Sequence, residues 1–169
     1  WSPEEREEIG KELRKTLRKA EKVKVWVTHN GKFDYDKLRT LLKANRWSAP
    51  IVDTMFMAHL LDDNRAGDNE TKGGSIGYKL KSLAREWLNY HHYDESTLDS
   101  RNQGGLALEA LPLKDFVKYG GEDAYVTLRL FNYILQQAEK EHYRSKLLRM
   151  AVYWGARMLE MIPTMERWG

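Results

Sequence analysis

Two short segments of this sequence carry side chains that could do chemistry together. Tyr119 and Asp123 stand four residues apart in an expected helix, so both point the same way. Asn30 and Asp34 are also four apart, and they bridge the end of an apolar strand and the start of a helix. Two carboxylates and a phenol delivered to one place are groups suited to metal-assisted phosphodiester hydrolysis.

Each of these residues also has a purely structural interpretation. An aspartate at a helix start, such as Asp34, is usually a cap, and a lone tyrosine such as Tyr119 is usually a core residue. Asp123 is harder to explain in this way, because aspartate is a mediocre helix former and the neighbours of Asp123 are apolar. Gly120 and Gly121 each cost about 1 kcal/mol in a helix relative to alanine. That cost suggests a close approach of the helix backbone to a sheet or to a substrate.

Apolar periodicity predicts the elements that must position these groups. It predicts helices after Ser2 and near Asp34, strands at residues 23–27 and 50–53, a helix that Asp53 can cap, and helices over 78–88, from 112 to about 137, and through 147–159. The polar, glycine-rich stretches 62–77 and 94–110 predict loops. Strands mixed with helices in this order predict an α/β domain that is rich in helix.

Composition sets limits on the class of protein. The chain has 169 residues, of which 41% are hydrophobic and 31% charged, as expected for one globular domain. It has no cysteine, which excludes disulfides and thiolate metal sites and is compatible with a cytoplasmic location. No apolar run is long enough to predict a membrane span. The formal charge of +3 is compatible with a nucleic-acid partner but too small to argue for one.

Four segments resemble the proofreading 3′→5′ exonuclease domain of family A DNA polymerases, which belongs to the tyrosine branch of the DEDD exonucleases. These segments are VTHNGKFDYDKL, VDTMFMAHLLDDN, LKSLAREWL and YGGEDAYVTLRLF. The resemblance implies a ribonuclease H-like fold and a site with two Mg²⁺ or Mn²⁺ ions about 4 Å apart. It also implies that the substrate is a single-stranded or frayed DNA 3′ end.

The same resemblance implies a role for each candidate residue. Asp34 corresponds to the second motif and Asp123 to the third, and both are expected to hold metal. Tyr119 is expected to orient the attacking water. Asn30 is expected to bind near the terminal nucleotide or to hold the strand end, and Phe33 to line the substrate cleft or pack in the core.

The first motif of that family, an Asp-x-Glu on an opening strand, does not occur upstream of Asn30. Asp68-Asn69-Glu70 matches the Asp-x-Glu pattern, but it lies in an expected glycine-rich loop after the second motif, so we do not assign it as the first motif. We therefore expect an N-terminally truncated exonuclease domain over residues 1–150. Residues 151–169 are expected to form a junction helix leading to a polymerase domain in the same polypeptide. Residues 1–169 by themselves are expected to hydrolyse DNA very slowly, if at all.

Three alternatives remain open from the sequence. The first is an RNA-processing exonuclease of the same superfamily, which a preference for the 2′-hydroxyl would favour. The second is a catalytically dead exonuclease fold that serves as a DNA-binding or structural module. The third is an active site whose opening strands come from a separate chain.

Overall fold

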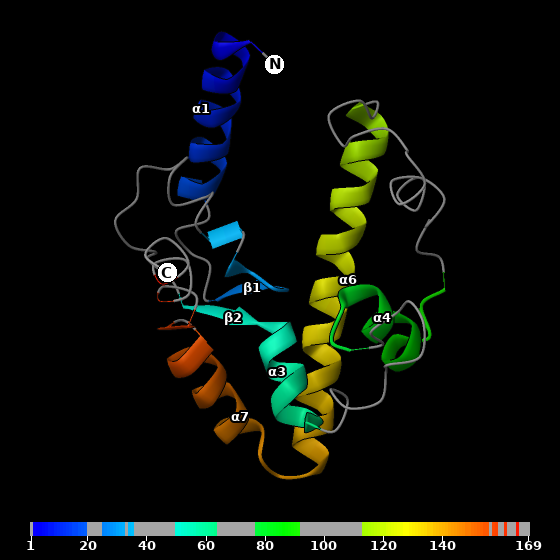
Figure 1. Cartoon of the computed structure of the whole chain (residues 1–169). Helices are drawn as coiled ribbons and strands as arrows, with labels where there is room; N and C mark the ends of the chain where they lie inside the picture. Colours follow the sequence, from blue (N-terminus) through cyan, green and yellow to red (C-terminus); the bar gives the residue numbers. More distant parts are fainter. Residues whose placement is uncertain are drawn as a thin grey trace. The chain divides into compact units, whose positions relative to one another are not determined.

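A computed structural model describes residues 2–19, 25–32, 34–35, 50–63, 77–91, 113–155, 157–158, 161 and 165 (Figure 1). Its elements are α1 (Pro3–Lys19), β1 (Trp26–Thr28), β2 (Ile51–Asp53), α3 (Thr54–Leu61), α4 (Leu80–Leu88), α6 (Leu113–Lys140), α7 (Arg144–Met150) and a π-helical segment (Ala151–Gly155). The chain divides into two compact units, one formed by residues 1–57 and 145–169 and the other by residues 58–144.

The first unit contains a small parallel sheet. β1 pairs with β2 in a register that sets Trp26 opposite Ile51 and Thr28 opposite Asp53. All three residues of β2 are buried, and Tyr35 packs with Ile51 and Trp26 beside the sheet. The π-helical segment Ala151–Gly155 contacts β2 as well. The carboxyl ends of both strands therefore lie at one edge of the sheet.

The second unit is built from α4 packed on α6. Ala84 of α4 and Val126 of α6 are fully buried in the contact, and Leu80, Leu88 and Tyr90 pack around them. α4 ends at Asn89, which adopts the left-handed conformation with φ of 50°. The backbone N–H groups of Asn89 and Tyr90 both donate to the carbonyl of Ala84, so the chain turns tightly there.

Most of the expected helices and strands occur within the described residues, although the last helix is α-helical only over Arg144–Met150 before it becomes π-helical. The expected loops at 62–77 and 94–110 lie almost wholly outside the described residues. The mixture of helices with a two-stranded sheet confirms a helix-rich α/β architecture, while the ribonuclease H-like topology stays a prediction. Of the strand expected at 23–27, residues 23 and 24 lie outside the described residues, while Trp26 and Val27 belong to β1, which extends to Thr28 through its pairing with Ile51–Asp53. The division into functional segments 1–150 and 151–169 also stays a prediction. None of the helices in the described ranges has the length and apolarity needed to cross a membrane.

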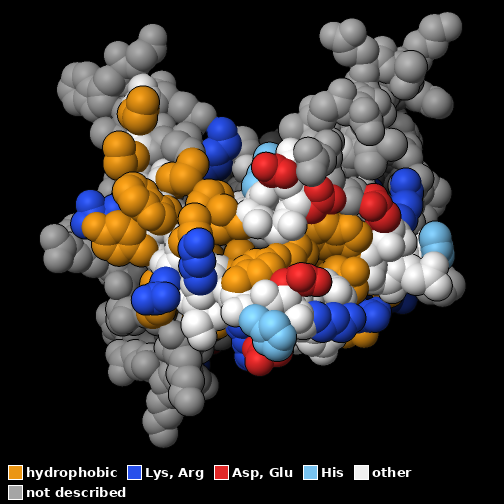
Figure 2. Space-filling model, turned by 90° about the horizontal axis from the view of Figure 1, so that it is seen from below, with side chains coloured by type: hydrophobic (Ala, Val, Ile, Leu, Met, Phe, Trp, Pro, Cys, Tyr) orange, Lys and Arg blue, Asp and Glu red, His pale blue; other side chains and the backbone are white. Residues whose placement is uncertain are grey.

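Large apolar side chains are exposed on three parts of the described surface, and the one on α1 is Ile9. On α6 they are Val117, Tyr125 and Leu128, and near the C-terminus they are Tyr153, Trp154, Met158, Met161 and Met165. Figure 2 shows apolar side chains gathered beside Lys and Arg on one face of the molecule. Arg129 lies beside the rings of Tyr90 and Tyr125, and Arg157 lies beside the ring of Tyr153.

Candidate functional site

The turn that follows β1 holds the candidate residue Asn30 and its neighbour Gly31 in a constrained backbone. Asn30 has φ of 55°, a left-handed conformation that asparagine tolerates better than most residues. Gly31 is buried, and a Cβ at this position would lie 2.6 Å from the Cβ of Thr28. Because real side chains do not approach so closely, this turn requires glycine at position 31.

The carboxylate of Asp53 fixes this turn to the start of α3. One oxygen accepts hydrogen bonds from the backbone N–H groups of Asn30 at 3.1 Å, Met55 at 2.8 Å and Phe56 at 3.4 Å. The other accepts from the N–H of Gly31 at 2.6 Å. Asp53 is only 6% exposed. This one buried carboxylate therefore both caps α3 and anchors the turn after β1.

Three further side chains tie the end of β1 to β2 and α3. The hydroxyl of Thr28 donates to the carbonyl of Val52 at 3.2 Å, and the hydroxyl of Thr54 donates to the carbonyl of Thr28 at 2.9 Å. His29 Nδ1 lies 2.8 Å from the Thr54 hydroxyl oxygen. Since that hydroxyl proton is given to Thr28, the oxygen accepts from His29, which assigns the hydrogen to Nδ1. His29 therefore lies at the end of β1, where its ring is held by Thr54.

Asp34 lies in the helical segment that follows this turn and already includes Lys32. The N–H of its neighbour Tyr35 donates to the carbonyl of Gly31 at 2.8 Å, and the Tyr35 ring is buried against Ile51 and Trp26. The backbone of Asp34 is thus anchored by the residues around it, while its own side chain is exposed. Phe33 lies outside the described residues.

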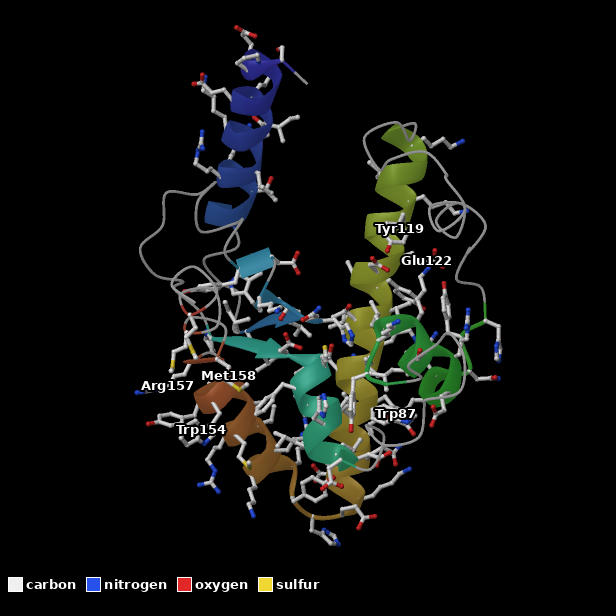
Figure 3. The ribbon with its side chains drawn as sticks, viewed as in Figure 1. Trp87, Tyr119, Glu122, Trp154, Arg157 and Met158 are labelled. Carbon is white, nitrogen blue, oxygen red and sulfur yellow. The ribbon has the colours of Figure 1, made fainter. Side chains whose placement is uncertain are left out.

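Tyr119 and Asp123 lie one turn apart on α6, as their spacing predicts. Both side chains are half-buried and share a helix face with Val126 and Leu130, which are fully buried. Figure 3 labels Tyr119 on α6, close to Glu122. A tyrosine hydroxyl and a carboxylate are therefore presented together from one rigid helix. The positions of Asp34 and Asn30 relative to this pair remain a prediction, because they belong to the other unit.

Gly120 and Gly121 are exposed, and a Cβ at either position would meet nothing within 4 Å. Approach of the α6 backbone to the sheet stays a prediction, because the sheet belongs to the other unit. Approach of a substrate to the bare helix backbone stays a prediction.

Glu122, which lies between the two motif residues, is engaged from α4. The hydroxyl of Tyr90 donates to the Glu122 carboxylate at 2.8 Å. This hydrogen bond, with burial and the nearby negative charge as smaller causes, raises the pKa of Tyr90 above its ordinary value of 10.0. Because the bond joins the segment after α4 to the motif turn of α6, it holds that turn in place.

The donor chemistry of the candidate residues suits a hard divalent cation. Asp34 and Asp123 offer carboxylate oxygens, which Mg²⁺ and Mn²⁺ prefer. Over the described ranges, no group of three or more His, Asp or Glu side chains comes together in a way that could hold a metal ion. The metal site that the motif assignment implies stays a prediction.

Sequence reasoning identified Asp53 only as a helix cap and did not identify the Tyr90–Glu122 bond. The reach of Asp53 to Gly31 joins residues 22 apart in sequence, and Tyr90 and Glu122 are 32 apart. A signal for the first was available, since Asp53 ends a strand parallel to the one that precedes Asn30. No local pattern indicates the second.

Comparisons with known proteins place the chain in a family. A family model described as 3′-5′ exonuclease matches residues 6–139, a range that includes both motif segments. DNA polymerase I of Treponema pallidum (strain Nichols) is 29% identical over 113 residues, which are 67% of this chain and 10% of that protein. The chain thus spans about a tenth of the length of this relative. No solved structure matches the chain.

Proposed function

Because the chain belongs to the 3′-5′ exonuclease family, we propose that it forms the part of a DNA polymerase that removes mispaired nucleotides from a DNA 3′ end with the help of divalent metal ions. The observation that carries this proposal is the pair of motif residues on α6. The family match covers them, and the helix presents Tyr119 and Asp123 one turn apart on a half-buried face.

In this proposal Asp34 and Asp123 hold two Mg²⁺ or Mn²⁺ ions through their carboxylates. When bound, such ions supply a nucleophilic water and stabilise the leaving 3′ oxygen. Asp123 is half-buried on a long helix, which suits a ligand whose direction is fixed. Asp34 is exposed on an anchored turn, which suits a ligand that reaches its metal partly through water.

Tyr119 has the role of a positioning group. A phenol is a weak base, so its useful contribution is a hydrogen bond that orients the attacking water. α6 holds the Tyr119 backbone, and the Tyr90–Glu122 bond ties the same turn to α4. A water bound by Tyr119 is therefore held by a group that has little freedom to move.

Asn30 and Phe33 are proposed to contact the terminal nucleotide. Asp53 accepts the backbone N–H of Asn30, which leaves the exposed Asn30 side chain directed by a fixed turn. Residues 151–169 are proposed as the junction to the polymerase domain. The relative's name, DNA polymerase I, supports DNA rather than RNA as the substrate and does not favour a dead binding module.

The test is a hydrolysis assay with labelled oligonucleotides. A polypeptide that contains this chain together with an Asp-x-Glu strand ahead of it is given 5′-labelled single-stranded DNA, in Mg²⁺, in Mn²⁺ and in EDTA. We expect stepwise shortening from the 3′ end that depends on the metal and is slower on the matching RNA. Faster cleavage of RNA, or cleavage that persists in EDTA, would contradict the proposal.

A further inference from the structure

Two tyrosines and an arginine form a cluster where the segment after α4 meets α6. The rings of Tyr90 and Tyr125 have centroids 6.4 Å apart and are tilted by 59°. The Arg129 guanidinium carbon lies 5.9 Å from the Tyr90 ring centroid and 5.7 Å from that of Tyr125. Glu122 accepts the Tyr90 hydroxyl at 2.8 Å and so fixes one ring in place. The cluster is therefore organised before any ligand arrives.

The exposed members of this cluster continue into a stripe along α6. Lys118, Gly121, Tyr125 and Arg129 follow one another at spacings of three or four residues, so they lie on one face of the helix. At about 1.5 Å per residue the stripe is roughly 16 Å long. All four residues are exposed, and open space surrounds the bare backbone of Gly121. We call these four residues the α6 stripe.

The hydrogen-bond donors of the stripe are available to a ligand. Among the described residues, Arg129 contacts the two rings but makes no ion pair or hydrogen bond, and Lys118 makes neither. The nearby carboxylate of Glu122 is bonded to Tyr90 instead. A guanidinium held over aromatic rings with free N–H groups is well suited to bind a phosphate. Tyr125, which is 54% exposed, offers a ring face beside it.

We propose that the α6 stripe binds single-stranded DNA away from its reacting 3′ end, with a base stacked on Tyr125 and backbone phosphates on Arg129 and Lys118. Alternating cations and exposed aromatic rings are how proteins hold single strands without reading their sequence. A purely apolar partner would leave both cations without a counter-charge, whereas a polyanion supplies one. The bare backbone at Gly121 gives the strand room to lie close to the helix.

This inference rests on the proposed function for the identity of the ligand. Tyr119 and Arg129 are ten residues apart on one helix, which is roughly 15 Å along its axis. A strand whose 3′ end is bound at Tyr119 and Asp123 could therefore extend to the stripe. The stripe lies about 120° around the helix from the face of Tyr119 and Asp123, so a strand bound at both must also pass around the helix. The stripe would add affinity for longer strands and would add nothing for a substrate too short to reach it.

The experiment measures binding by the 169-residue chain in EDTA, so that hydrolysis plays no part. Fluorescence anisotropy reports the affinity for a 5′-labelled oligothymidylate dodecamer and for a trinucleotide. The test variants are Tyr125→Ala and Arg129→Gln. Tyr153→Ala is the matched aromatic control, because Tyr153 is 55% exposed and lies 4.8 Å from the Arg157 guanidinium carbon. Lys140→Gln is the charge control, at the far end of α6.

We expect Tyr125→Ala to weaken dodecamer binding about tenfold, the effect of losing one stacked base. Arg129→Gln should weaken it as well and reduce the slope of log affinity against log salt by about 0.7. Both controls should stay within about twofold of the parent chain, and trinucleotide affinity should not change. Circular dichroism checks that each variant is folded. If Tyr125→Ala does not fold, the affinity and salt dependence of Arg129→Gln test the inference.

Several results would overturn the inference. They are failure of the parent chain to bind the dodecamer, unchanged binding by the test variants, an equal loss in Tyr153→Ala, or binding of a protein partner but not of DNA. The proposed function fails in a different way, through absence of metal-dependent hydrolysis. A chain that does not hydrolyse DNA but loses DNA affinity in Tyr125→Ala would support the inference about the α6 stripe. A chain that hydrolyses DNA and binds it equally well with Tyr125→Ala would contradict that inference.

Discussion

Replacing Asp53 with alanine should loosen the turn after β1 and the start of α3 together. The substitution removes the acceptor for four backbone N–H groups, those of Asn30, Gly31, Met55 and Phe56. The Gly31 N–H is buried, so water cannot easily replace the lost carboxylate there. The remaining three groups are partly buried. Alanine therefore leaves donors without acceptors in a region that also contains the buried strand β2.

The size of the effect follows from the geometry of these bonds. A hydrogen bond to a charged group contributes about 1.5–3 kcal/mol, and loss of a helix N-cap costs about 0.5–2 kcal/mol. The bonds to Gly31 at 2.6 Å and Met55 at 2.8 Å are short, while that to Phe56 at 3.4 Å contributes little. Counting the two short bonds and allowing for non-additivity, Asp53→Ala should lower the free energy of unfolding by about 3–4 kcal/mol.

The variant Asp53→Asn should have a stability between those of the parent chain and Asp53→Ala. Its amide oxygen can keep the bonds to Asn30 and Met55, but its amide nitrogen then faces the Gly31 N–H, so one donor meets another. We expect a loss of about 1–2 kcal/mol. Asp63→Ala, an exposed acid just beyond α3, is the control and should change stability by less than about 0.5 kcal/mol.

Urea unfolding followed by far-ultraviolet circular dichroism measures these differences. The order of stability should be the parent chain and Asp63→Ala together, then Asp53→Asn, then Asp53→Ala. A loss below about 1 kcal/mol in Asp53→Ala would refute the argument, because it would mean that this carboxylate does not hold the turn.

Two further predictions concern stability. Gly31→Ala should lower the free energy of unfolding by about 1–3 kcal/mol, because the new Cβ meets the Thr28 side chain, whereas Gly121→Ala meets open space and should raise it by up to about 1 kcal/mol. Urea midpoints measure both, and equal signs would contradict the packing argument. Burial lowers the pKa of His59, so the unfolded chain takes up the proton first as pH falls below about 6.5, and stability should decline there. His59→Gln should reduce the decline in stability between about pH 7 and pH 5. An unchanged slope in His59→Gln would count against this reasoning.

Local patterns predicted the elements that carry the candidate residues. The helix around Tyr119 and Asp123, the short strand before Asp53 and the helix that Asp53 caps all have signals within a few residues. The edges of the first strand were less predictable, because Trp26–Thr28 is defined by its pairing with β2 rather than by its own alternation.

Contacts between distant segments could not be predicted in this way. Nothing near Asp53 indicates that its second oxygen binds the Gly31 N–H, because that contact exists only once the two strands pair in register. The Tyr90–Glu122 bond likewise depends on how α4 packs on α6. The motif residues themselves were identified by type and spacing, while the groups that hold them required the fold.

The most direct test of the central claim is the rate of 3′ shortening in variants of α6. In a polypeptide that supplies the Asp-x-Glu strand, Asp123→Ala should lower the single-turnover rate in Mg²⁺ by several orders of magnitude, and Tyr119→Phe by about 10- to 100-fold. Two control variants should retain nearly the full rate. Glu139→Ala removes an exposed acid far along the helix that pairs with Arg144. Tyr133→Phe removes a hydroxyl but keeps the ring that stacks on Trp87.

The account predicts that order: full rate in both controls, a moderate loss in Tyr119→Phe and near-complete loss in Asp123→Ala, with all four variants folded. An Asp123→Ala variant that shortens DNA as fast as Glu139→Ala does would contradict the account, because a metal-holding carboxylate at this position could not then be part of the reaction.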